Sequence, residues 1–470
     1  MFADVNHRDV FEYFSKICSI PHGSGNTKGI ADYLCGFAVE NNLKFYRDDM
    51  NNVIIYKNAS EGCEDKPAVI LQGHSDMVCD SVGKFDFETQ PIEIVRDGDI
   101  IRANGTTLGA DNGIAGAMML SILADKDACH PALECVFTTD EETGMFGALA
   151  LNYSKLSGKI MFNLDSDGEG IITCGCAGGA SCHLDIPMTV EKNIKPCYKL
   201  SVDGLLGGHS GVMIGTNRAN AIKLAAKVLA EIATDCQIIS ISGGSKENAI
   251  PSVAEVVFAS SCDFDFVSVT EYYEQYVKNT FTDTEPSVSL SAIDMIDTAF
   301  DESSSHKLIA LINEMPTGVV EMSKDIEGLV QTSLNCGVIA TEEGKVKFDI
   351  SVRSNVKSRK IDIINMIKDI SAKYGYSVEV SGEYPSWEYN PLSDAKMTAI
   401  YVYRRMFGKE PKIEVIHAGL ECGVFTDNIP GLDCIAFGPT LEDIHTVNER
   451  VEIGSVCRVF EYLVELLKNI

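Results

Sequence analysis

The apolar residues in the first third of the chain follow two different periods. Between residues 9 and 40 they recur every three or four positions on either side of a glycine- and serine-containing break at 21–26, which predicts two amphipathic helices. Nearly continuous apolar runs at 67–72, 133–138 and 159–164 are typical of buried strands, and 114–124 predicts a buried helix. This alternation indicates an α/β sheet with covered faces up to about residue 178.

The pattern changes between about residues 180 and 388. Strands are predicted at 198–202, 237–242, 253–260, 328–340, 345–352 and 376–381, and helices at 220–233, 306–313 and 360–374. Two successive rounds of helix and antiparallel strand indicate a separate α+β domain. A helix at 394–407, a strand at 433–437 and a helix at 454–469 complete the chain.

Each of the three apolar runs in the first part is followed by side chains that bind metals. Ligands at the carboxyl ends of strands lie where open α/β sheets place their sites. Asp111 in a glycine-flanked turn and His445 near the carboxyl end add to this group. The full set contains two histidines and three carboxylates, namely His74, Asp111, Glu142, Asp165 and His445. Such a set suits two zinc-like ions that share one bridging carboxylate.

Two further carboxylates near these strand ends suggest catalytic roles. Alternation in an extended segment sends His74 and Asp76 to the same side, so Asp76 is predicted to orient the ligating imidazole. Glu141 and Glu142 are adjacent and point in different directions, so one can bind metal while the other faces the substrate. A free carboxylate at that position is the general base that amide hydrolysis requires.

Each of these residues also has an ordinary structural interpretation. Glu141 and Glu142 could form an acidic loop, Asp111 could be a helix N-cap, and His445 could be a loop histidine. Two other acidic residues, Asp167 and Glu169, are close enough in sequence to compete with Asp165 for the ligand role.

The position of His445 has a consequence for the domain organisation. If His445 shares a site with His74, the catalytic domain is discontinuous. We therefore predict an α/β catalytic domain formed by residues 1–178 and 389–470, with an α+β domain inserted at 179–388.

Composition narrows the possible partners. The chain carries 39 Lys and Arg against 68 Asp and Glu, a formal net charge of −29, which disfavours nucleic acid and anionic lipid. Small molecules or peptides are the expected partners. No apolar run approaches the roughly 18 residues of a membrane-spanning helix, and the amino end lacks a signal-peptide pattern. The 16 scattered cysteines fit a reducing cytoplasm, and Cys174-Gly-Cys176 is expected to form a glycine-rich turn rather than a metal site.

Six separated motifs, in order along the chain, carry a resemblance to a known family. They begin at Gly73 (GHSDMV), Gly105 (GTTLGADNG), Thr139 (TDEETGM), Asn163 (NLDS), Gly207 (GGHSG) and His417 (HAGLECG). With these motifs the chain resembles the cytosolic aminoacyl-histidine dipeptidases, which belong with the di-zinc aminoacylase and carnosinase type peptidases. One departure is Ser75, which stands where relatives usually carry Met or Thr.

The resemblance assigns a role to each predicted ligand. It implies Asp111 as the bridging ligand, His74 and Asp165 on one metal, and Glu142 and His445 on the other. It also implies Glu141 as the base and a cis peptide between Asp111 and Asn112. The cofactors would be two divalent ions, most simply Zn²⁺, although the same ligands also suit Mn²⁺ or Co²⁺.

The resemblance extends to the inserted domain. His209 matches the histidine that polarises the scissile carbonyl, and Asn248 is expected to assist it. Arg353 matches a position that clamps the substrate carboxylate, with a surface strand arginine as the alternative. His417 and Glu421 are assigned to the substrate from their motif alone.

These residues together predict a cytoplasmic di-zinc dipeptidase that hydrolyses unblocked dipeptides, including Xaa-His and β-Ala-His. A water bridging the metals would attack, Glu141 would take and return its proton, and the inserted domain would close over the substrate as a lid. The alternatives are an aminoacylase or broader aminopeptidase on the same scaffold, and a non-catalytic metal- or peptide-binding protein. A monomer and a homodimer are both compatible with the sequence.

Overall fold

The computed structural model describes residues 1–470 and divides the chain into two compact units. Unit 1 contains residues 1–176, 387–415 and 420–470. Unit 2 contains residues 177–386 and 416–419. Each unit has its own hydrophobic core, so each buries its apolar side chains separately. None of the helices combines the length and the apolar character that a membrane-spanning segment requires.

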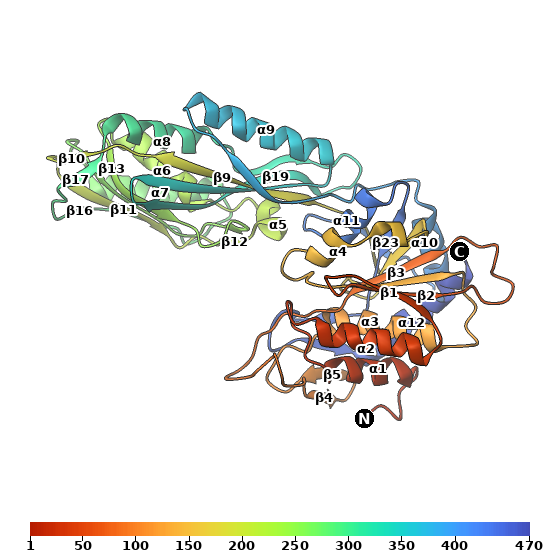
Figure 1. The fold of residues 1–470 in the computed structure, drawn as a ribbon. Helices are drawn as coiled ribbons and strands as arrows, with labels where there is room; N and C mark the ends of the chain where they lie inside the picture. Colours follow the sequence, from red (N-terminus) through yellow and green to blue (C-terminus); the bar gives the residue numbers. More distant parts are fainter. The chain divides into compact units, whose positions relative to one another are not determined.

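Unit 1 is built on a mixed sheet of eight strands (Figure 1). In spatial order the strands are β1 (Lys44–Arg47), β2 (Val53–Lys57), β6 (Leu133–Thr138), β3 (Val69–His74), β7 (Ile160–Asn163), β23 (Asp433–Ala436), β8 (Ile171–Cys176) and β22 (Lys412–Ile416). The central strands β6, β3, β7 and β23 run parallel. Strands β6 and β3 are buried along their whole length, as continuous apolar runs in a covered parallel sheet should be.

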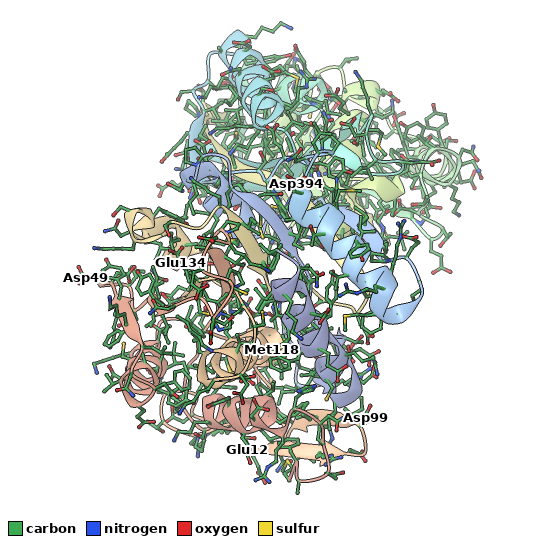
Figure 2. The ribbon with its side chains drawn as sticks, turned by 90° about the vertical axis from the view of Figure 1, so that its right-hand side faces the viewer. Glu12, Asp49, Asp99, Met118, Glu134 and Asp394 are labelled. Atoms are coloured by element: carbon green, nitrogen blue, oxygen red, sulfur yellow. The ribbon has the colours of Figure 1, made fainter.

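Helices lie on both faces of this sheet, with α1, α2, α3 and α12 on one side and α4 and α11 on the other (Figure 1). The helices of unit 1 are α1 (Arg8–Cys18), α2 (Lys28–Glu40), α3 (Ala110–Ala124), α4 (Phe146–Ala150), α10 (Asp394–Phe407), α11 (Glu421–Asn428) and α12 (Ile453–Lys468), with a 3₁₀ turn η1 (Tyr153–Lys155). Helix α3 is buried almost throughout, and Met118 on it lies among the side chains of unit 1 (Figure 2). A Cβ on Gly113 would lie only 3.2 Å from Phe14, so glycine permits the close packing of α3 against α1.

A second, smaller sheet in unit 1 joins segments that are far apart in sequence. It consists of β4 (Ile94–Asp97), β5 (Ile100–Ala103), β24 (Leu441–Glu442) and β25 (Arg450–Glu452). Strand β25 pairs with β5, with Val451 opposite Ile101. This pairing fixes the loop that carries His445 next to the segment that leads into α3.

Unit 2 contains a large antiparallel sheet, with helices packed against it. The strands on its main path are β16 (Ser287–Ile293), β11 (Cys197–Asp203), β15 (Ala254–Ala259), β13 (Gln237–Gly243), β19 (Val330–Glu342), β20 (Lys345–Ser354), β9 (Gly178–Pro187) and β21 (Glu379–Tyr384), and β18 (Gly318–Met322) pairs with β19. Two short pairs are β10 (Val190–Lys192) with β17 (Thr298–Phe300) and β12 (Gly208–His209) with β14 (Ala249–Ile250). The helices are α5 (Ser210–Met213), α6 (Ala221–Ile232), α7 (Phe266–Thr280), α8 (Glu302–Glu314) and α9 (Lys357–Lys373), with a 3₁₀ turn η2 (Ile214–Thr216).

The predicted mixed α/β fold is confirmed, and the differences are local. The segment 174–176 is the end of strand β8 and not a glycine-rich turn, because both cysteines are buried in the sheet. The elements that sequence analysis did not predict include α7 and α11 among the helices and β1, β2, β8, β9, β16 and β22 among the strands. Residues 416–419 belong to unit 2, although the chain on either side of them belongs to unit 1.

Candidate metal centre and catalytic site

Three parallel strands bring the predicted ligands to one edge of the sheet of unit 1. Gln72 lies opposite Val136 on one neighbouring strand and Asn163 on the other, so the strands end at the same level. His74 is the last residue of β3, and Thr138 is the last residue of β6. The carboxylates that follow β6 and β7 therefore emerge beside His74.

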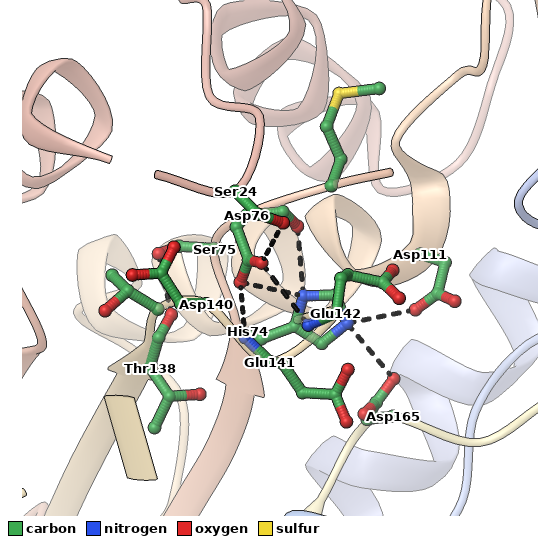
Figure 3. A network of polar contacts seen from close by, with 12 residues as sticks. Ser24, His74, Ser75, Asp76, Asp111, Thr138, Asp140, Glu141, Glu142 and Asp165 are labelled. Carbon is green, nitrogen blue, oxygen red and sulfur yellow. Dashed lines mark hydrogen bonds and ion pairs between the residues drawn. The ribbon is translucent and has the colours of Figure 1, made fainter. Parts of the chain in front are cut away.

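Asp111 lies between two histidine and carboxylate pairs. Its Oδ1 is 3.1 Å from Nε2 of His74, and its Oδ2 is 3.1 Å from Nε2 of His445. Nε2 of His74 is also 3.7 Å from Oδ1 of Asp165, and Nε2 of His445 is 3.1 Å from Oε2 of Glu142. Figure 3 shows His74, Asp111, Glu142 and Asp165 converging. The five predicted ligands are therefore brought together, with one oxygen of Asp111 directed to each side.

The chemistry of this group fits divalent cations. Ligand atoms of His74, Asp111 and Glu142 all lie within 4.8 Å of one another, and Oε1 of Glu142 is buried without a hydrogen-bond partner. Hydrogen bonds with Asp111 and Glu142 raise the pKa of His445 to about 10. In the absence of a metal, the carboxylates of Asp111 and Glu142 therefore keep His445 protonated. An imidazole is neutral when it binds a metal, so the proton occupies a position that attracts positive charge. Nitrogen and oxygen donors of these types are those that zinc-like ions bind.

Asp76 contacts both His74 and the segment that carries the two glutamates. Nδ1 of His74 is 3.0 Å from the backbone oxygen of Asp76 and 3.5 Å from its carboxylate, so the closer contact is with the main chain. The carboxylate accepts hydrogen bonds from Ser24 Oγ at 2.7 Å, from the backbone N–H of Glu141 at 3.2 Å and from that of Glu142 at 3.4 Å (Figure 3). Asp76 therefore fixes the positions of the glutamates as well as the orientation of the imidazole.

Glu141 has the acid–base property expected of a proton carrier. Burial raises the pKa of its carboxyl to about 7, and the negative charge of Glu142 acts in the same direction. A carboxyl with a pKa near the working pH can both take up and release a proton. Glu142 has a different contact, because its Oε2 lies 3.1 Å from Nε2 of His445.

Glu449 is a site residue that sequence analysis missed. It is 2% exposed, and its two carboxylate oxygens accept hydrogen bonds from four consecutive backbone N–H groups. The distances are 2.7 Å from Leu108, 3.0 Å from Gly109, 2.8 Å from Ala110 and 3.2 Å from Asp111. Glu449 is thus a carboxylate cap for the amino end of α3, and it holds the segment that presents Asp111.

The start of α3 bears on two predictions for Asp111, a cis peptide after it and a role as helix N-cap. The peptide bond between Asp111 and Asn112 is cis, as the resemblance implied. Asp111 is not the N-cap of the helix, because Gly109 occupies that position with a φ of 70°. The capping role therefore falls to Glu449, and both oxygens of Asp111 face histidines.

The competing acidic residues behave differently from Asp165. Glu169 is engaged by Arg458, with Nε 2.8 Å from Oε1 and Nη2 2.7 Å from Oε2. Burial raises the pKa of Asp167 to about 6. Asp165 alone among the three has an ion-pair distance to His74, at 3.7 Å.

Glu421 is buried inside unit 1. Its side chain is 0% exposed, and Oε2 accepts hydrogen bonds from Gln72 Nε2 at 2.5 Å and Thr138 Oγ1 at 2.7 Å. Oε1 is buried without a hydrogen-bond partner, and burial raises the pKa of the carboxyl to about 8. The contacts join Glu421 to the ends of β3 and β6, so it supports the strands that carry His74 and the loop with Glu141.

In unit 2, Arg353 is a buried residue of β20. It is 9% exposed, Nη1 donates to Tyr384 Oη at 3.0 Å, and Nε has no hydrogen-bond partner. The alternative of a surface strand arginine is therefore wrong. A buried guanidinium with an unpaired N–H is suited to bind a carboxylate.

His209 and Asn248 come from the paired strands β12 and β14 and the turn before β14. His209 is exposed and lies opposite Ala249 in this pair. The backbone oxygen of Asn248 accepts a hydrogen bond from the N–H of Ser210 at 2.8 Å, which holds the loop beside His209. Desolvation and the charge of Arg353 lower the pKa of His209, so its imidazole is neutral at neutral pH.

His417 is held as a neutral imidazole in unit 2. Nδ1 is 3.0 Å from Asn355 Oδ1, and Nε2 is 2.8 Å from Ser333 Oγ. Because the amide nitrogen of Asn355 donates to the backbone oxygen of Ile416 at 2.8 Å, its Oδ1 faces His417 and accepts from Nδ1–H. Nε2 then accepts from the Ser333 hydroxyl. Burial, with the charge of Arg353, lowers the pKa of His417 to about 3.

The fold and this site define a metallopeptidase. A model of the peptidase family M20/M25/M40 matches residues 70–469, and the chain belongs to this family. The family resemblance that the six motifs indicated is thereby confirmed.

Individual relatives cover the whole chain. The cytosol non-specific dipeptidase of Escherichia coli K12 is 37% identical over 485 residues, covering 100% of this chain and 99% of that protein. The crystal structure of aminoacylhistidine dipeptidase from Vibrio alginolyticus matches with a TM-score of 0.93 and 36% identity, covering 100% of this chain and 98% of that one. Human carnosine dipeptidase 1 matches with a TM-score of 0.52 at 12% identity, covering 98% of this chain and 95% of that one, which is a similarity of fold.

Proposed function

We propose that this chain is a metal-dependent dipeptidase that hydrolyses unblocked dipeptides, including Xaa-His and β-Ala-His, in the cytoplasm. The observation that carries the proposal is the position of Asp111, with one oxygen 3.1 Å from each of two histidines that also meet separate carboxylates. The full-length similarity to a dipeptidase from Escherichia coli and an aminoacylhistidine dipeptidase from Vibrio alginolyticus supports the choice of substrate class.

The ligands divide into two groups around Asp111. His74 and Asp165 would hold one cation, Glu142 and His445 the other, and Asp111 would contact both. When bound, two divalent cations acidify water and stabilise negative charge on the scissile carbonyl oxygen. Zn²⁺ is proposed, with Mn²⁺ and Co²⁺ as alternatives, because the nitrogen and oxygen donors accept all three.

The chain's own residues carry the proton and orient the reacting groups. Glu141 would accept a proton from the attacking water and pass it to the departing amine, for which a pKa of about 7 is suitable. Asp76 holds the backbone of Glu141 and the orientation of His74, so the base and the ligand keep a fixed relation.

We propose that unit 2 acts as a lid and binds the substrate at two groups, its carboxylate and its scissile carbonyl oxygen. Arg353, with its unpaired Nε, would bind the substrate carboxylate. His209, neutral at pH 7, would donate to the carbonyl oxygen with help from Asn248. We propose that His417, buried and hydrogen-bonded in unit 2, supports the substrate-binding groups of that unit. Glu421, buried in unit 1, would support the strands that carry His74 and the loop with Glu141.

A small substrate panel tests the proposal. Metal-stripped protein would be assayed after addition of Zn²⁺, Mn²⁺ or Co²⁺ on β-Ala-His, Gly-His, Ala-Ala, an N-acetylated dipeptide and a tripeptide. Metal-restored cleavage confined to the free dipeptides is the expected result. Preferential cleavage of the acetylated substrate would favour an aminoacylase, and cleavage of longer peptides would favour a broader aminopeptidase. Binding of two metals without any hydrolysis would favour a non-catalytic binding protein.

A further inference from the structure

Two cysteines of unit 1 that play no part in the site lie side by side. Sγ of Cys63 is 3.2 Å from Sγ of Cys129. A disulfide bond is about 2.05 Å long, so the sulfurs need to approach by only about 1.2 Å. Cys129 is exposed, whereas Cys63 is 3% exposed. One residue of the pair is therefore accessible to reagents, and the other is buried beside it.

Hydrogen bonds between the two loops hold this pair in place. Cys63 lies in the loop before β3, and Cys129 lies in the loop before β6. The backbone N–H of Ser60 donates to the oxygen of His130 at 3.0 Å, and the N–H of His130 donates to Ser60 Oγ at 2.9 Å. The N–H of Cys63 also donates to the oxygen of Ser60 at 3.0 Å. The proximity of the sulfurs is therefore set by the backbone and not by two mobile side chains.

We propose that Cys63 and Cys129 form a reversible disulfide when the protein meets a small-molecule disulfide such as oxidised glutathione. The thiolate of Cys129 attacks one sulfur of oxidised glutathione, which forms a mixed disulfide and releases one glutathione thiolate. The thiolate of Cys63 then attacks the sulfur of Cys129 and releases the second. Two protein thiols are oxidised, one glutathione disulfide is reduced, and the two protons end on the two glutathione molecules.

The local chemistry assigns different roles to the two sulfurs. Hydrogen bonds with Cys129 and Ser60 lower the pKa of the Cys63 thiol, which favours its thiolate as the resolving nucleophile. Another neighbouring pair, Cys422 and Cys434, has a different environment, because both residues are buried and burial raises the pKa of both thiols. We expect no reaction at that second pair.

The bond would cross-link the sheet at the end opposite the candidate site. The loops that contain Cys63 and Cys129 lead into the amino ends of β3 and β6, whereas His74 and Thr138 are the last residues of these strands. The closed ring would include His74 and Asp111. The disulfide would thus cross-link the segment that carries the candidate site without occupying the site.

The experiment uses the full chain, reduced and then exposed to oxidised glutathione under native conditions. Free thiols are blocked with N-ethylmaleimide, and a non-reducing digest is examined by mass spectrometry. The expected result is a Cys63–Cys129 linked peptide that disappears on reduction. The variant C63S should retain a stable glutathione adduct on Cys129, because the resolving thiol is gone, and C129S should show neither product.

A matched control is C79S, which removes another exposed cysteine and should form the linked peptide as the unchanged protein does. Far-UV circular dichroism establishes that each variant is folded before oxidation. A persistent glutathione adduct on Cys129 of the unchanged protein, without the linked peptide, would overturn the proposal. An unreacted Cys129 under the same conditions would also overturn it.

Discussion

The carboxylate of Glu449 accepts a hydrogen bond from the backbone N–H of Asp111 at 3.2 Å. Three preceding N–H groups donate to the same carboxylate, so one buried side chain fixes the whole turn that presents Asp111. A negative charge at a helix amino end is also favoured by the helix dipole. The proposed metal centre would therefore depend on a residue that itself binds no metal.

Replacing Glu449 with Gln should loosen this turn. The amide NH₂ group meets N–H donors instead of accepting from them, and leaving buried donors unsatisfied costs about 1–3 kcal/mol of stability. We expect a lower free energy of unfolding together with weaker retention of metal during dialysis against a chelator. Denaturant unfolding and metal analysis by mass spectrometry provide the two measurements. A variant with normal stability and normal metal content would contradict the assigned role.

Glu141→Gln should abolish turnover while the metal is retained. The amide cannot carry the proton, and general acid–base catalysis contributes about 10²–10⁴-fold to rate. The measurement is kcat for a free dipeptide at a fixed metal content. The neighbouring Asp140→Asn is the matched control, because Asn can still accept the hydrogen bond that Asp140 Oδ1 receives from Gly25 at 2.6 Å. Near-normal activity in both E141Q and D140N would remove Glu141 from the mechanism.

Arg353→Ala should raise KM for dipeptides with a smaller change in kcat. The lost interaction binds the substrate carboxylate before and during the reaction, so it acts mainly on binding. A dipeptide amide, which lacks the carboxylate, should be processed equally by the variant and the unchanged protein. Arg359→Ala provides a control for loss of a positive charge, since Arg359 pairs with Glu321 and Asp362. Identical KM values in all three proteins would exclude the clamp.

His417 should make the stability of the protein depend on pH. Burial lowers its pKa from 6.5 to about 3, so between these values the unfolded chain binds a proton that the folded chain does not. The contribution of His417 to the free energy of unfolding is fully present above about pH 6.5. It falls as the pH drops towards 3, by at most about 1.4 kcal/mol per pH unit. The variant His417→Gln, which can keep both hydrogen bonds, should show a shallower decline between about pH 4 and 6. Parallel pH profiles in urea unfolding would show that His417 is protonated in the folded state.

Local patterns in the sequence were sufficient for the central parallel strands and the long helices of unit 1, but not for its short strands. The runs 67–72, 133–138 and 159–164 correspond to β3, β6 and β7, because a strand buried on both faces must be apolar along its length. The same logic placed metal-type ligands at one sheet edge, where the structure has them. Helix α7 was missed because its apolar face is sparse, with Tyr273 and Val277 as its buried residues.

The tertiary structure alone decided which distant groups meet. The sequence was enough to predict the candidate ligands, the proposed role of Glu141 and a change of pattern near residue 178. It could not determine that Glu449 caps the turn of Asp111, since these residues are separated by 338 positions and the contact depends on the pairing of β25 with β5. It also gave no sign that Cys63 meets Cys129 or that Glu421 is enclosed by Gln72 and Thr138. Side-chain periodicity reports which face of an element is buried, whereas these contacts arise from the packing of separate segments.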